Sequence, residues 1–196
     1  MTDPRRFKLI PVEKLTTEQR AVYDGIRSGP RSKMGNSSAT SAGPLGGPFN
    51  AMLRSPEIGN IVQSLGGAIR FKSSLSNKLN EFAIIITARY WTANYEWHAH
   101  CKLAIDAGLD PAKAKDVAEH RRPANMDDDE AAIYDFSKEL HEKKSVSDEN
   151  FQRVVDRFGE RGAFDLIACN GYYSLVSMIL NVDKVPLPDG VPMPLK

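Results

Sequence analysis

The apolar positions along this chain recur at helical spacing over most of its length. Thr16 to Gln19 has the form of a capping box and predicts a helix through Ile26. No window shows the sustained alternation of apolar and polar residues that is typical of a half-buried strand. The pattern therefore predicts an all-α fold, a single domain built as a helical bundle.

The next three predicted helices each have a start signal. Ser55 precedes a proline at the first helical position, and this helix is expected to run to about Phe71. Ser76 caps a helix that is apolar enough to be buried on two sides, which predicts the central helix. Its apolar face comprises Leu79, Phe82, Ala83, Ile84, Ile85, Ile86 and Tyr90. The following helix is expected from about Asn94 to Ala107, with Gly108 in the usual C-terminal position.

Four more helices are predicted in the second half. They begin at Pro111, within the acidic run 127–130, after the capping residue Ser147, and at about Ala163. The acidic run suits the positive end of a helix dipole, and the sequence suggests no other role for it. The last helix, to Leu180, is the most apolar. Charged and polar residues interrupt it, so it is expected to be a buried core helix and not a membrane span.

Breaks in the helical pattern divide the chain into four parts. We expect an N-terminal helical extension over 1–28, a loop over 29–50, the helical domain over 51–182 and a proline-rich extended tail over 183–196. Of the 22 residues in the loop, 12 are Gly, Pro or Ser, so it is expected either to be a lid over a site or to be disordered. The tail cannot be helical and needs another surface, such as a neighbouring subunit.

Composition excludes several classes of partner. The chain has 26 Lys and Arg against 25 Asp and Glu, so no strong field attracts nucleic acid. Its two cysteines give no disulfide framework and no zinc spacing. The N-terminal residues lack the apolar segment of a secretory signal, so a cytoplasmic protein is expected.

The densest group of reactive side chains lies between residues 94 and 102. Glu96 and His100 are four residues apart and share one face of the predicted helix, while His98 is turned by roughly 200°. A carboxylate beside an imidazole raises the pKa of the ring and fixes its tautomer, as a general acid or base requires. The alternative is an ordinary surface pair. The apolar residues around it favour an enclosed pair with a function.

Other readings of the reactive residues are weaker. A metal site is not expected, because His98 and His100 diverge on a helix and no di-iron spacing occurs. Cys101 has no resolving cysteine nearby, and Cys169 lies on an apolar helix. His120 and His141 are each followed by basic residues and are interpreted as solvated helix ends.

Three segments resemble the carboxymuconolactone decarboxylase family, which shares the all-helical fold of the AhpD-like alkylhydroperoxidases. They are Gly47–Glu57, Leu79–Ile85 and Tyr95–His100, the last followed by Ala104–Leu109. The resemblance spans about residues 45–182. It implies a homo-oligomer, whether dimer, trimer or hexamer, with pockets at or near the subunit contacts.

The family's peroxidase branch has a Cys-x-x-Cys-x-x-x-His motif and an upstream glutamate. Alignment on Gly108 places that histidine at His100, the cysteines at Ala93 and Glu96, and the glutamate at Glu81. Both thiols are therefore absent, and the two-thiol peroxidase cycle lacks its chemistry. The decarboxylase branch has Glu-x-x-x-His in this register, which Glu96 and His100 match.

The resemblance implies a lyase that removes CO2 from a small carboxylated lactone during the breakdown of aromatic compounds. No metal or organic cofactor is expected. We expect His100 to deliver a proton, Glu96 to orient it and Glu81 to act as a relay behind it. Further pocket candidates are Tyr90, Trp97, His98 and Cys101, and candidates for binding the substrate carboxylate are Arg54, Arg70 and Arg89. Two alternatives remain, a peroxiredoxin-type redox enzyme acting through Cys101 alone and a non-catalytic helical oligomer or small-molecule binding module.

Overall fold

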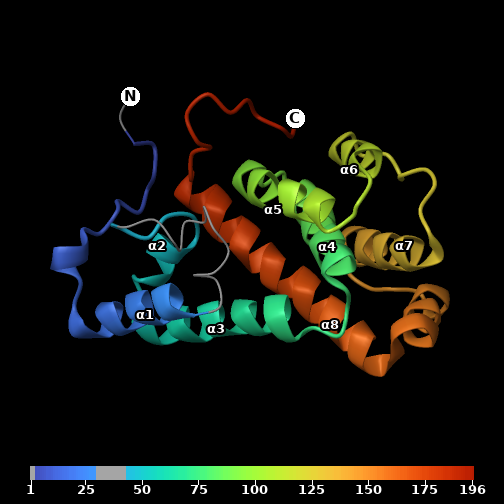
Figure 1. Ribbon diagram of the computed structural model, residues 1–196, viewed down its shortest axis with the longest axis horizontal. Helices are drawn as coiled ribbons and strands as arrows, with labels where there is room; N and C mark the ends of the chain where they lie inside the picture. Colours follow the sequence, from blue (N-terminus) through green and yellow to red (C-terminus); the bar gives the residue numbers. More distant parts are fainter. Residues whose placement is uncertain (1–2, 30–42) are drawn as a thin grey trace. The chain divides into compact units, whose positions relative to one another are not determined.

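A computed structural model describes residues 3–29 and 43–196 (Figure 1). Within these residues the regular structure is entirely helical, which confirms the predicted all-α fold. The elements are η1 (Val12–Lys14), α1 (Thr17–Ser28), α2 (Phe49–Met52), α3 (Pro56–Lys72), α4 (Asn77–Tyr90), α5 (Asn94–Asp106), α6 (Pro111–Ala118), α7 (Asp128–Lys143) and α8 (Asp148–Asp183).

The residues predicted to start the helices form the expected capping hydrogen bonds. Thr16 accepts a hydrogen bond from Gln19 N, and the Gln19 side chain accepts one in return from Thr16 N, which completes the capping box of α1. At the start of α4 the Ser76 side chain accepts a hydrogen bond from Leu79 N, and at the start of α6 the Asp110 side chain accepts one from Ala112 N. Gly108 follows α5 with a φ of 103°, a conformation that glycine adopts without strain.

The C-terminal part of the chain confirms the prediction of two helices, which together carry the label α8. They meet at a kink at Gly159, where φ is 70° and ψ is 174°. The helix beyond this kink begins about three residues before Ala163. The charged residues Glu160 and Arg161 interrupt the apolar pattern there, and this moved the predicted boundary.

The chain forms two compact units. The first comprises Met1–Lys72 and Ile179–Pro186, and the second comprises Ser73–Met178 and Leu187–Lys196. The first unit has its own apolar core, made of Val22, Ile26, Leu45, Phe49, Met52 and Leu53. Most of the predicted lid or disordered loop, residues 30–42, lies outside the described residues.

Helix α4 is the central element of the second unit, as its broad apolar face predicted. Eleven of its 14 residues are buried, and it packs against α5, α6 and α7 (Figure 1). It also contacts α8, because Thr87 Oγ1 lies 3.0 Å from Asn170 Oδ1. Polar groups on this helix are therefore shielded from water on nearly every side.

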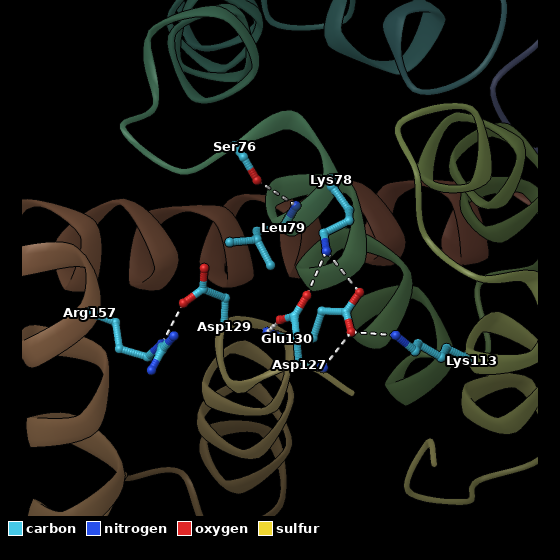
Figure 2. Close-up of polar contacts among 8 residues, drawn as sticks. All are labelled: Ser76, Lys78, Leu79, Lys113, Asp127, Asp129, Glu130 and Arg157. Atoms are coloured by element: carbon cyan, nitrogen blue, oxygen red, sulfur yellow. Dashed lines mark hydrogen bonds and ion pairs between the residues drawn. The ribbon is translucent and has the colours of Figure 1, made fainter. Parts of the chain in front are cut away.

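The acidic start of α7 does more than complement the helix dipole, which was the only role expected from the sequence. Glu130 is 1% exposed and accepts hydrogen bonds from Lys78 Nζ at 3.0 Å and Lys113 Nζ at 2.5 Å (Figure 2). Asp127 accepts a second bond from Lys78 at 2.9 Å, and Asp129 pairs with Arg157 of α8. These contacts join α7 to α4, α6 and α8, and sequence spacing could not show them because the partners are distant in the chain.

The proline-rich tail contains no helix and ends against the second unit of its own chain. Leu195 N donates to Asn94 Oδ1 at 2.9 Å, and Leu195 is 3% exposed. The carbonyl of Lys196 accepts a hydrogen bond from Arg89 at 2.8 Å. Helices α4 and α5 therefore provide a surface for the end of the tail.

Among the described helices, α8 alone is long and apolar enough to cross a membrane, judged by length and composition. Half of its most apolar window is buried inside the protein. The core helix of a globular protein meets the same criteria, so this is weak evidence for a membrane span.

Candidate functional site

A buried histidine between two carboxylates lies at the contact of α4 and α5. His100 Nδ1 is 2.6 Å from Glu81 Oε2, and His100 Nε2 is 3.1 Å from Glu96 Oε1. The three side chains are 7%, 2% and 4% exposed, respectively. Both nitrogens of the ring are thus bound by carboxylate oxygens in a nearly dry environment.

The local fold explains how these residues meet. Glu96 and His100 lie one turn apart on α5, and Glu81 lies on the buried second turn of α4. The connection between the helices is only three residues long, and Thr92 within it has a φ of 46°. This short reversal returns α5 along α4, so that residues 19 positions apart come into hydrogen-bonding contact.

The surroundings of His100 determine its charge. Burial by itself would lower the pKa of the imidazole, but the negative charges and hydrogen bonds of Glu81 and Glu96 outweigh it and raise the pKa to about 9. At neutral pH the ring is therefore an imidazolium whose two N–H groups both donate to carboxylates. Such an imidazolium can donate a proton, and the adjacent carboxylates favour its reprotonation.

An aromatic pair from α8 borders the site. The ring of Tyr173 lies 5.1 Å from the imidazole of His100, at an interplanar angle of 75°. Tyr172 packs edge-on against Tyr173 at 5.1 Å. Tyr173 was not predicted from the sequence, because it is 73 residues from His100 and lies in an ordinary apolar helical pattern.

The arrangement is poorly suited to a metal ion. Glu81 and Glu96 approach opposite nitrogens of the ring, so the three groups do not converge on one point. Among the described residues no cluster of three or more His, Cys, Asp or Glu side chains has the geometry of a metal site.

The other predicted pocket residues lie in different environments. His98 is exposed, on the side of α5 away from His100, and Trp97 is buried. Cys101 is partly buried, and burial raises the pKa of its thiol. Tyr90 is 40% exposed and stacks on His141.

The three candidate cations have different environments. Arg89 is 6% exposed, and its guanidinium donates to the carbonyl of Lys196 and contacts His120. Arg54 is exposed and donates a hydrogen bond to the carbonyl of Lys8. Both Arg54 and Arg70 lie in the first unit.

The interpretation of His141 as a solvated helix end is wrong. It is 7% exposed, and its Nε2 lies 2.9 Å from Thr87 Oγ1. Burial is the main cause that lowers its pKa to about 4, so the ring is neutral at pH 7. Its position eight residues after Ile133, on the inner face of α7, was the sequence signal for burial, and the neighbouring lysines obscured it.

These features define an all-helical protein with a buried acid/base cluster. A family model, the Carboxymuconolactone decarboxylase family, matches residues 56–139. The matched segment contains Glu81, Glu96 and His100, and the all-helical fold is consistent with the AhpD-like superfamily. No curated protein and no solved structure matched the chain.

Proposed function

We propose that this protein is a cofactor-free carboxy-lyase that removes CO2 from a carboxylated lactone or a related small acid of aromatic-compound breakdown. The observation that supports the proposal most is the imidazolium of His100, held at both nitrogens by buried carboxylates. The family match over the same residues supports the reaction class.

The chemistry needs one proton donor. When the carbon–carbon bond to the carboxylate breaks, CO2 leaves and its bonding electron pair remains on the substrate, spread into the conjugated carbonyl group. The carbon then takes a proton from the imidazolium, a carbon–hydrogen bond forms and the ring becomes neutral. A buried donor of this kind typically accelerates such a step by about 10² to 10⁴.

The two glutamates have different roles in this proposal. Glu81 makes the shorter bond, 2.6 Å to Nδ1, and fixes the orientation and charge of the ring. Glu96 makes the longer bond, 3.1 Å to Nε2, so the proton on Nε2 is the one transferred. The substrate carbon takes the place of the Glu96 carboxylate as acceptor, and the ring is afterwards reprotonated from solvent.

A single-cysteine redox enzyme is less well supported. A reactive thiol needs a lowered pKa, whereas burial raises the pKa of Cys101. Hydroperoxide turnover by the wild type that disappears in Cys101→Ser would favour this alternative.

The proposal is tested by following CO2 release from carboxylated lactones and small β-keto acids. We expect turnover by the wild type and a loss of about 10² to 10⁴ in His100→Gln. His98→Gln is the matched control, because His98 is exposed on the other side of the same helix, and it should keep full activity.

Two results would contradict the proposal. The first is full turnover in a folded His100→Gln variant. The second is binding of these acids to the wild type without CO2 release, which would instead favour a small-molecule binding module.

A further inference from the structure

The imidazole of His100 has a neighbour besides its two carboxylates. The ring of Tyr173 lies 5.1 Å from it, measured between centroids, and the two ring planes meet at 75°. Tyr173 is 2% exposed. Three helices therefore surround the imidazole, with Glu81 on α4, Glu96 on α5 and the tyrosine on α8.

The carboxylates and the tyrosine meet different parts of the imidazole. Glu81 and Glu96 are bound to its two nitrogens, so the C–H edges and the faces of the ring remain for Tyr173. In a nearly perpendicular pair of rings, the positive edge of one ring is attracted to the negative face of the other. Because the imidazole is charged at neutral pH, the favourable arrangement directs its C–H edge at the face of Tyr173.

The distance and the burial both suit an attraction of this kind. A cation over an aromatic face is stabilised when it lies within about 6 Å of the ring centroid. The separation of 5.1 Å between His100 and Tyr173 satisfies this condition, and both residues are buried. Water therefore competes little for the charged ring. An aliphatic side chain in place of the tyrosine would be equally apolar but would offer no such attraction.

Contacts one turn earlier on α8 fix the position of Tyr173. Asn170 is 1% exposed, and its Oδ1 accepts a hydrogen bond of 3.0 Å from Thr87 on α4. Its amide nitrogen donates to Ser137 Oγ on α7 at 3.1 Å. These bonds join α8 to both neighbouring helices. The tyrosine thus projects from a well-supported part of the fold, as a group that positions another side chain requires.

Proton transfer leaves His100 with fewer restraints. In the proposed reaction the substrate replaces Glu96 as the partner of Nε2, so the ring keeps one hydrogen bond to a carboxylate, the bond of 2.6 Å to Glu81. A ring held at one nitrogen can tilt about that bond. Packing of Tyr173 against the imidazole limits the tilt and keeps Nε2 directed at the substrate carbon.

We propose that Tyr173 is a positioning residue of this site, whose aromatic face receives a C–H edge of the charged His100 ring, stabilises the imidazolium and holds Nε2 in place during proton transfer. The role in turnover rests on the proposed function. The contact between the two rings does not depend on it and can be tested without a substrate.

Nuclear magnetic resonance titration of His100 tests the contact. Tyr173→Leu removes the aromatic face but keeps an apolar side chain, so the pKa of His100 should fall by about 0.5 to 1 unit. Tyr173→Phe keeps the face and should leave the pKa unchanged. Tyr134→Leu is the matched control, because Tyr134 is also buried but stacks on Phe82, and it should leave the pKa unchanged.

The wild type offers a second measurement that requires no variant to fold. A proton over the face of an aromatic ring is shielded, whereas a proton beside its edge is deshielded. One ring C–H proton of His100 should therefore resonate upfield of its position in the unfolded chain. A downfield displacement of both ring protons would overturn the proposal, and so would a pKa that Tyr173→Leu leaves unchanged or raises.

The rate of CO2 release tests the role in turnover. Tyr173→Leu should lower kcat by about 3- to 10-fold with little change in KM, and the decline at high pH should move down by the same 0.5 to 1 unit, about as far as the pKa. Tyr173→Phe should keep the wild-type kcat and profile. An unchanged kcat in Tyr173→Leu would overturn the positioning role. If the wild type releases no CO2, the proposed function fails and the role in turnover fails with it, while the titration alone decides the contact between the rings.

Discussion

The charge of His100 gives the sharpest prediction about the buried site. Replacing Glu81 with Gln removes the carboxylate that makes the shorter bond to the ring while preserving its size. We expect the pKa of His100 to fall from about 9 towards or below its ordinary value of 6.5. Burial lowers this pKa, and after the substitution Glu96 is the only carboxylate at the ring that opposes that effect.

The size of the effect follows from the shift. A rise from 6.5 to about 9 corresponds to about 3 kcal/mol of preference for the charged ring in the folded protein. Glu81 and Glu96 share this preference, and the shorter contact should provide more than half of it. Glu81→Gln should therefore lower the pKa by at least about one unit, and Glu96→Gln by less.

Nuclear magnetic resonance titration of the histidine ring carbons measures this directly, with His100→Gln used to assign the resonance. The stability contributed by the charged ring is complete below pH 6.5 and is lost as pH rises through about 9, so unfolding by urea should show the same window. A wild-type pKa at or below 6.5 would refute the reasoning, and so would an unchanged pKa in both glutamine variants.

Three further predictions concern stability, each measured by urea unfolding. Glu130→Ala should cost about 3 kcal/mol, because two partly buried lysines lose their shared carboxylate, and an unchanged midpoint would contradict this. Gly159→Ala should cost about 1–2 kcal/mol because of its positive φ, whereas the helical control Gly171→Ala should cost nothing. The wild type should lose stability as pH falls from 6.5 towards 4, and His141→Gln should show a smaller loss, since the folded protein favours the neutral ring.

Local signals in the sequence were sufficient for most of the fold. Capping residues such as Thr16 and Ser76 act within one turn of the helices they start, so their effect can be inferred without knowing the tertiary structure. The break between the two helices of α8 was also predicted, although the charged residues Glu160 and Arg161 moved the expected start of the second helix to about Ala163. The central position of α4 followed from apolar residues on two faces.

The site was predictable only in part. The contact between Glu96 and His100 follows from helical spacing, whereas Glu81 was indicated only by the resemblance to the family. Tyr173, like the lysine partners of Glu130, reaches its neighbour through helix packing. Long-range contacts of this kind depend on the turn geometry and register between helices, which periodicity does not specify.

The pH dependence of CO2 release is the most direct test of the central claim that a buried imidazolium supplies the proton. With a carboxylated lactone that the wild type decarboxylates, we predict a rate that is sustained through neutral pH and declines as pH rises through about 9, where His100 loses its proton. In Glu81→Gln the decline should move to lower pH by at least about one unit. A rate that increases through pH 9, or a profile that Glu81→Gln leaves in place, would contradict the account.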